Sequence, residues 1–199
     1  GNAAMSAGIA ALETGANVLM LEKASEELAG GNTKYTAGAM RFSYENSEEL
    51  LPLLSNPDDE RISRTDFGTY TKENFSNDLL DFNEGRPLSS EQTYLVSESY
   101  DAVRWLAGHG VTYEPIYSRQ SYEKDDKIIF WGGLALAARD EGVGLYNMEA
   151  MTYKNLGGSI RFNAGVTELL TSDRKVSGVI VDGEKYKSDA VILACGGFE

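Results

Sequence analysis

The residues with the clearest chemical use stand at the start of the chain, where a glycine and an acid bracket a helix and a strand. Gly1 opens a run of small residues that is typical of a helix lying close against a sheet, and an apolar stretch at 18–21 follows a turn. Glu22 ends that stretch, and its distance from Gly1 matches the roughly 20 residues between glycine turn and acid in a dinucleotide-binding βαβ unit. Such a glycine lets main chain approach a pyrophosphate, and the acid accepts hydrogen bonds from ribose hydroxyls. The sequence therefore predicts the second half of a dinucleotide-binding unit.

The first half of that unit would lie upstream of Gly1. The fingerprint G-x-G-x-x-G/A should follow a strand, whereas this sequence begins inside the fingerprint and has no initiator Met. If Gly1 is the second glycine, Ala4 holds the third position. We expect the sequence to be a fragment. An ordinary helix and strand with a chance Gly and Glu is the alternative for this stretch alone.

Two further glycine loops follow the acid. Gly30-Gly31 precedes the short polar side chains of Asn32 and Thr33, and a second loop is centred on Gly38. Glycines at such positions let the main chain pass close to a flat or phosphorylated ligand, where side chains would collide. A flexible surface loop is the alternative for Gly30-Gly31.

Composition narrows the class of protein. The 199 residues are 42% hydrophobic and 25% charged, as in ordinary soluble domains, and can form one substantial core. A net charge of −13 argues against nucleic acid or an anionic membrane as a partner. The lone cysteine excludes an internal disulfide framework and suits a reducing, cytoplasmic location. No run approaches the roughly 20 apolar residues of a membrane span, and we predict no metal site.

The rest of the chain predicts a mixed α/β order. A polar excursion at 44–64 precedes a helical pattern at 65–82, and Ser89 opens a capped helix that stops near His109. A strand at 111–117, a loop at 118–127, a helix at 144–156 and a strand at 160–162 follow. Turn signals then predict a three-stranded meander at 166–170, 176–181 and 184–187. The apolar run at 190–194, like the run at 18–21, is typical of a buried parallel strand covered on both faces.

Four segments in this order, GNAA…LEK, AGGNTKYTAGAM, the meander after AGVTELL, and ILACGGFE, resemble the FAD-binding domain of the fumarate reductase / succinate dehydrogenase flavoprotein family. Within that family the sequence is most similar to the FAD-dependent tricarballylate dehydrogenase group, through GGNTKYT, WLAGHGVTYEP, FWGG and GGFE. The resemblance spans essentially the whole chain. It implies an α/β, three-layer, Rossmann-like FAD-binding domain of the glutathione-reductase type, with a β-meander and a helical insertion, truncated at both ends. The implied boundaries are 1–43 and 131–199 for the FAD-binding domain and 44–130 for the insertion.

The resemblance also implies roles for individual residues. One group would hold the pyrophosphate, the phosphates and the adenosine, and a second would approach the flavin ring or close over the cofactor. The first group is Gly1, Asn2, Ala3, Ala4, Glu22, Lys23, Gly30, Gly31, Asn32, Thr33 and Val166. The second group is Ala37, Gly38, Ala39, Ala194, Cys195, Gly196 and Gly197. Asn32 stands where respiratory members carry a flavin-linking histidine, which implies non-covalent FAD, and we expect Cys195 to be a small buried filler.

The implied reaction moves a hydride between flavin N5 and a substrate carbon, making or reducing a C=C bond beside a carboxylate or carbonyl. The family's catalytic residues lie in a capping domain and a C-terminal segment beyond GGFE, so the resemblance assigns none of them to this sequence. Arg41 is the one cation that we place near the active site. The implied partners are a small carboxylate or carbonyl substrate and an unidentified electron donor or acceptor. A nicotinamide-dependent dehydrogenase and a non-catalytic flavin-binding module are the alternatives.

Overall fold

The computed structural model describes residues 1–197 and divides into two compact units. The first unit comprises residues 1–35 and the chain from Tyr146 onward, and the second comprises Thr36–Leu145. Helix α6 (Glu141–Asn155) begins in the second unit and ends in the first. The predicted domain boundaries at 43 and 131 stay a prediction, and the final Phe198 and Glu199 of the GGFE motif lie outside the described residues.

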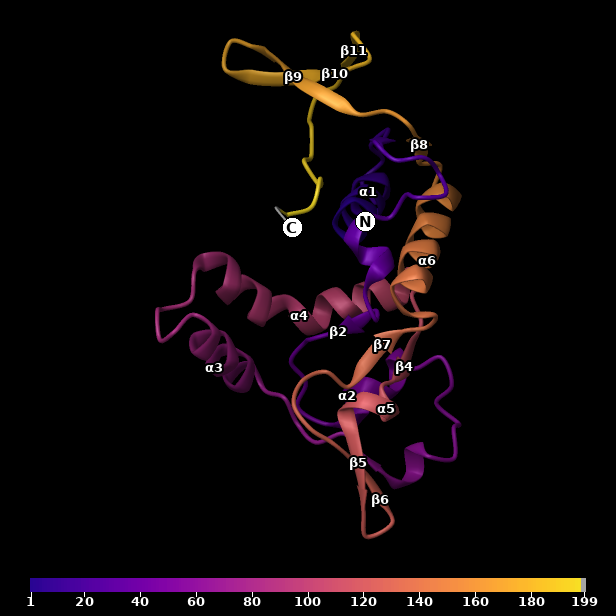
Figure 1. The fold of residues 1–199 in the computed structure, drawn as a ribbon, viewed down its shortest axis with the longest axis vertical. Helices are drawn as coiled ribbons and strands as arrows, with labels where there is room; N and C mark the ends of the chain where they lie inside the picture. The colour runs from indigo at the N-terminus through magenta and orange to yellow at the C-terminus, as the bar shows by residue number, and fades with distance from the viewer. Residues whose placement is uncertain (198–199) are drawn as a thin grey trace. The chain divides into compact units, whose positions relative to one another are not determined.

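The first unit contains a parallel strand pair and a meander, and Figure 1 shows the meander as β9, β10 and β11. Its elements besides α6 are α1 (Asn2–Glu13), β1 (Leu19–Leu21), η1 (Gly31–Tyr35), β8 (Ser159–Arg161), β9 (Val166–Ser172), β10 (Lys175–Val181) and β11 (Glu184–Lys187). Strands β1 and β8 are parallel, with Leu19 opposite Ser159. The meander has the antiparallel order β11-β10-β9, which confirms the prediction from its turn residues.

A buried tyrosine joins α6 to both strands of the parallel pair. Tyr153 is fully buried, and its hydroxyl donates to the main-chain oxygens of Val18 and Ser159, each at 3.0 Å. Helix α1 contributes Met5 and Ile9 to the buried residues of this unit. The helix and its neighbouring strands are therefore held by apolar packing and by a satisfied buried hydroxyl.

The prediction of a buried strand at 190–194 is wrong. This segment forms no strand, and the side chains of Ile192 and Leu193 are 65% and 67% exposed. An apolar run becomes a buried strand only where a neighbouring strand completes its hydrogen-bond ladder, and β1 and β8 form a two-stranded sheet within the described chain. Strand β1 is likewise not covered on both faces, since Leu19 is 47% exposed.

The second unit is built from two small sheets and a helical hairpin. Its elements are β2 (Ala39–Met40), α2 (Ser47–Leu50), η2 (Leu51–Leu53), η3 (Ile62–Arg64), β3 (Thr65–Asp66), α3 (Lys72–Phe82), α4 (Ser90–Gly108), β4 (Tyr113–Pro115), α5 (Tyr117–Gln120), β5 (Ser121–Lys124), β6 (Lys127–Phe130) and β7 (Leu136–Ala138). The sheet orders are β2-β7-β4 and β3-β6-β5. Helices α3 and α4 lie beside each other (Figure 1).

Local signals placed the longest helix correctly. Ser89 caps α4 by accepting from the Gln92 N–H at 3.2 Å, and the Gln92 side chain accepts from the Ser89 N–H at 3.0 Å. The helix ends near His109, as predicted; His109 is the residue directly after Gly108, and its ring centroid lies 4.2 Å from that of Trp105. The reciprocal bonds between Ser89 and Gln92 satisfy two main-chain donors at the start of the helix.

Two neighbouring predictions were wrong. The pattern at 65–82 begins as strand β3, because Gly68 turns the chain at φ +63° before Thr71 caps α3. The expected loop at 118–127 instead contains α5 and the β5–β6 hairpin, whose turn has positive φ at Asp125 and Asp126.

Among residues 1–197, no helix has both the length and the apolar character needed to cross a membrane.

Candidate functional site

The N-terminus of α1 meets the first glycine loop. The Asn2 N–H donates to Thr33 Oγ1 at 2.9 Å. A Cβ on Gly1 would lie 2.6 Å from Thr33 Oγ1 and 2.7 Å from the Gly30 oxygen, so only glycine fits. Ala3 is exposed at this end, and the first N–H groups of a helix have no intrahelical acceptor. The structure thus brings predicted residues from both segments around one helix N-terminus, where main-chain N–H groups and the helix dipole favour an anion.

The glycine loop keeps its main chain open at one residue. Gly30 has φ +119° and packs against Tyr146 and Lys34, with a Cβ position 3.2 Å from each. Gly31 has φ +54°, and no atom lies within 4 Å of where its Cβ would be. Gly31 opens η1, which also carries Asn32. This side-chain-free stretch beside the start of α1 fits a phosphate-bearing group.

The end of β1 holds the predicted acid. Glu22 Oε1 accepts from the Ala24 N–H at 2.8 Å, and the Glu22 carbonyl accepts from the Ala164 N–H at 2.8 Å. The neighbouring Lys23 side chain packs on Gly165, since Lys23 Cγ lies 3.5 Å from the Cβ position there. The exposed Val166 follows directly at the start of β9. Glu22, Lys23 and Val166 therefore share one region, as a site for the adenosine end of a dinucleotide requires.

Helix α6 adds residues that sequence reasoning missed. Glu149 is 0% exposed and accepts from Ser6 Oγ of α1 at 3.0 Å. Tyr146 lies against Gly30, and burial together with the charges of Glu22 and Glu26 raises its pKa. The helical spacing puts Tyr146, Glu149 and Tyr153 on one helix face. This recurrence of polar side chains on one face is the sequence signal that could have identified them.

The second glycine loop belongs to the second unit and is tightly held there. Gly38 has φ +66°, and a Cβ on it would lie 2.7 Å from the Glu141 carbonyl carbon. The Gly142 N–H donates to the Thr36 oxygen at 3.0 Å, while β2 pairs with β7 through Ala39 opposite Ala137. The loop 37–39 is therefore fixed in shape by the start of α6 and by β7.

Arg41 is engaged within the same unit. Its guanidinium donates to Tyr70 Oη at 2.9 Å and to Asp78 Oδ2 at 3.1 Å, and the Tyr70 hydroxyl donates to the same carboxylate at 2.6 Å. Burial and the Asp78 bond raise the Tyr70 pKa, with Arg41 opposing them. A substrate carboxylate at Arg41 would share the guanidinium with Asp78.

The last segment that was predicted to contact the cofactor, residues 194–197, is largely exposed. Gly196 has φ +89° with no atom within 4 Å of its Cβ position, and Cys195 is exposed. The expectation that Cys195 is a buried filler is wrong, because the strand that would bury it is not formed. Ala194 and Gly197 belong to the same stretch, which forms neither helix nor strand, and the atoms nearest to the Cβ position of Gly1 belong to Thr33 and Gly30 instead.

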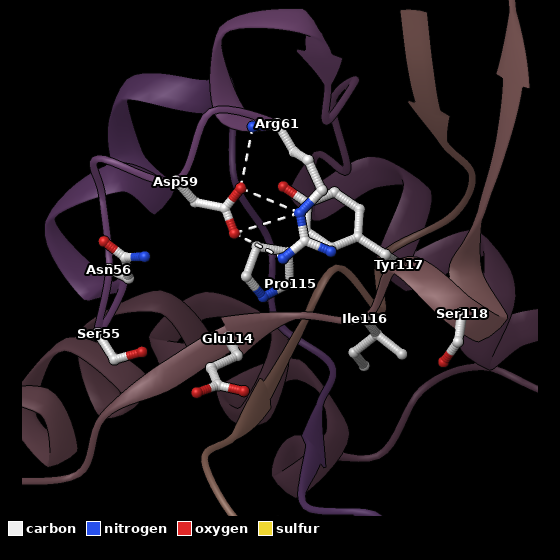
Figure 2. Close-up of a pocket in the computed structure, with 9 residues that line it drawn as sticks. All are labelled: Ser55, Asn56, Asp59, Arg61, Glu114, Pro115, Ile116, Tyr117 and Ser118. Atoms are coloured by element: carbon white, nitrogen blue, oxygen red, sulfur yellow. Dashed lines mark hydrogen bonds and ion pairs between the residues drawn. The ribbon is translucent and has the colours of Figure 1, made fainter.

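A hollow of about 470 Å³ in the second unit is lined by nine residues (Figure 2): Ser55, Asn56, Asp59, Arg61, Glu114, Pro115, Ile116, Tyr117 and Ser118. Arg61 Nε lies 3.0 Å and 3.2 Å from the two Asp59 carboxylate oxygens, and its guanidinium carbon lies 4.2 Å from the Tyr117 ring centroid. Hydrogen bonds from Arg61 lower the Asp59 pKa to about 2. Because Asp59 already neutralises Arg61, the lining offers little attraction to a carboxylate substrate.

Comparisons with known proteins find similarity over most of this chain. A fumarate reductase (cytochrome) of Shewanella frigidimarina is 28% identical over 204 residues, which cover 100% of this chain and 32% of that protein. A flavocytochrome c3 fumarate reductase in an open conformation superposes with a TM-score of 0.63 at 21% identity, over 92% of this chain and 29% of the other.

A 3-ketosteroid-Δ4-(5α)-dehydrogenase from Rhodococcus jostii RHA1 superposes with a TM-score of 0.62 at 19% identity, over 93% of this chain and 41% of that chain. This likeness and that of the flavocytochrome show a shared fold. The FAD binding domain family matches residues 1–199. With the helix N-terminus, the open glycine loop and the acid at the end of β1 in place, this chain belongs to the FAD binding domain family and binds FAD.

Proposed function

We propose that this chain is the FAD-binding part of a flavin-dependent oxidoreductase that acts on a carbon beside a carboxylate or carbonyl. The observation that carries the proposal is the contact between the start of α1 and the glycine loop, in the same unit as the acid after β1. Two relatives that match the whole chain are fumarate reductases. A fumarate-, succinate- or tricarballylate-like acid is the proposed substrate, and CH–CH oxidation or its reverse is the proposed reaction.

The chain's own residues bind and orient the cofactor. FAD, when bound, supplies hydride transfer at N5. The Ala3 N–H and the open main chain at Gly31 would hold its diphosphate, with Ala4 in the same first helical turn. Glu22 would accept from the ribose, while Lys23 and Val166 would flank the adenine. Residues 37–39 would approach the flavin ring, with Arg41 as a candidate cation for the substrate, and 194–197 would cover the cofactor.

Association with FAD is proposed to be non-covalent, since Asn32 offers a carboxamide where a linking histidine would be needed. We further propose a cytoplasmic location and an electron donor or acceptor as partner. Because the net charge of the chain is −13, an anionic substrate would need a local cationic site.

The experiment that tests this function is to purify the protein, record its visible spectrum and assay it with a reduced dye. We expect a flavin spectrum, release of the whole flavin by acid precipitation, and dye oxidation that depends on fumarate or a related unsaturated acid. Flavin without acid-dependent turnover would leave a flavin-binding module. Preferential retention of a nicotinamide cofactor would refute the FAD site.

Substituting Glu22→Gln should weaken FAD binding about tenfold, because a charge-assisted hydrogen bond to a ribose hydroxyl becomes a neutral one. Titration of the flavin-free protein with FAD, followed by flavin fluorescence, measures the Kd. The exposed Glu27→Gln, which makes the same charge change in the same unit, should leave the Kd unchanged. Equal affinities of wild type and Glu22→Gln would remove Glu22 from the site.

A further inference from the structure

Glu149 is a buried carboxyl that the cofactor roles above do not use. Its side chain is fully buried within the first unit. Ser6 Oγ donates to its Oε1 at 3.0 Å. With the Asn2 carboxamide oriented so that its nitrogen faces the carboxylate, that nitrogen lies 2.7 Å from Oε1 and 3.2 Å from Oε2. Both partners belong to the first turns of α1.

The position of these partners couples Glu149 to the diphosphate site. Asn2 offers its side chain to Glu149 and its N–H to Thr33 Oγ1. The residue therefore joins the carboxyl, the helix N-terminus and the glycine loop. A change in the charge of Glu149 is felt within one helical turn of the N–H groups that would hold the diphosphate.

The charge of Glu149 is poised to change near neutral pH. Burial raises its pKa to about 7, against which the Ser6 bond acts more weakly. On the same helix, burial and the charges of Glu22 and Glu26 raise the pKa of Tyr146. A bound diphosphate adds negative charge at the same helix end, and like charges disfavour the ionised carboxylate. Bound FAD should therefore move the carboxyl further toward its protonated form.

We propose that Glu149 is protonated when FAD is bound, so that FAD binding takes up a proton and weakens above neutral pH. The proposal rests on the FAD site proposed above. Glu149 acts as a positioning residue, because it reaches the cofactor only through Asn2, Ser6 and the field at the start of α1. The proton comes from solvent, and no bond other than the O–H of the carboxyl is formed.

The sign follows from linkage. A carboxyl whose pKa is higher in the complex than in the free protein favours binding fully below its free pKa. That advantage is lost as pH rises from the free pKa toward the pKa in the complex. With a free pKa of about 7, we expect the Kd for FAD to rise about tenfold between about pH 6.5 and about pH 8.5.

The test is calorimetric titration of the flavin-free protein with FAD in two buffers of different ionisation enthalpy, at several pH values. Wild type should take up a fraction of one proton near neutral pH. Glu149→Gln mimics the protonated carboxyl, and it should bind FAD without proton uptake and with a Kd that is constant over this range. Glu13→Gln, at the other end of α1, is the matched control and should keep the wild-type uptake.

A second variant keeps the proposal testable if Glu149→Gln fails to fold. Ser6→Ala removes a bond that favours the ionised carboxylate, so the pH at which FAD affinity begins to fall should move upward. FAD binding by wild type without proton uptake, or uptake that persists in Glu149→Gln, would overturn the role of Glu149 alone. Absence of FAD binding by wild type would instead overturn the proposed function.

Discussion

Gly38→Ala should destabilise the second unit by about 3 kcal/mol or more and deplete the purified protein of FAD. Two costs add. The residue has φ +66°, where a Cβ costs about 1–2 kcal/mol. The new Cβ would also lie 2.7 Å, 2.9 Å and 2.9 Å from the carbonyl carbon, Cα and oxygen of Glu141, which are main-chain atoms that cannot rotate aside.

The surrounding hydrogen bonds explain why the loop cannot simply move away. The Ala138 N–H donates to the Gly38 oxygen at 2.8 Å, and the Gly142 N–H donates to the Thr36 oxygen at 3.0 Å. Relieving the contact would break one of these bonds, each with a net contribution of about 1 kcal/mol. If residues 37–39 approach the flavin ring, the displacement also changes the shape of that approach.

Urea unfolding and the flavin content of the purified variant measure the two effects. Gly85→Ala is the matched control, because Gly85 has φ +79° in the same unit but no atom within 4 Å of its Cβ position. That variant should lose only about 1–2 kcal/mol, the cost of the backbone conformation. Equal losses in the two variants would show that the Glu141 contact adds nothing.

Elements with local signals could be predicted from the sequence. The Ser89 cap with Gln92 and the Asp182-Gly183 turn of the meander depend on residues a few positions apart, and both are in place. The ordered glycine motifs led to the FAD family, which the match over residues 1–199 confirms. The tricarballylate group within it stays a prediction.

Structural features that depend on residues distant in the sequence could not be predicted. Residues 190–194 have the composition of a buried strand, but burial requires a neighbouring strand, and the exposed Ile192 shows that composition alone is insufficient. In the sequence, nothing distinguishes Glu149 from the many other acidic residues of the chain. Its hydrogen-bond partner Ser6 lies 143 positions earlier in the sequence. The roles of the site residues toward FAD stay predictions, although the structure shows which of them lie together.

Gly8→Ala should destabilise the first unit by about 2 kcal/mol, opposite in sign to the usual effect of this substitution in a helix. Alanine normally gains about 1 kcal/mol over glycine there. At Gly8 the new Cβ would overlap the Met20 methyl group of β1 and would lie 2.8 Å and 3.1 Å from two carbons of the Tyr153 ring. Overpacking of a core costs about 1–3 kcal/mol, and a partner that cannot move places the cost at the upper end.

The two neighbours differ in how they can respond. Met20 has a flexible side chain and can turn away, whereas Tyr153 is fully buried and its hydroxyl is bonded to Val18 and Ser159. Moving its ring would leave a buried hydroxyl with strained or lost bonds, which is why the contact should outweigh helix propensity. The loss should appear in urea unfolding as a lower midpoint with an unchanged slope.

Gly108→Ala supplies the control, since Gly108 is helical in α4, exposed, and has no atom within 4 Å of its Cβ position. That variant should be neutral or stabilised by up to about 1 kcal/mol. A stabilised Gly8→Ala would mean that α1 can move away from β1 and α6. Because Asn2 and Ser6 on α1 contact Glu149 on α6, such freedom would also loosen the cluster through which FAD binding is proposed to take up a proton.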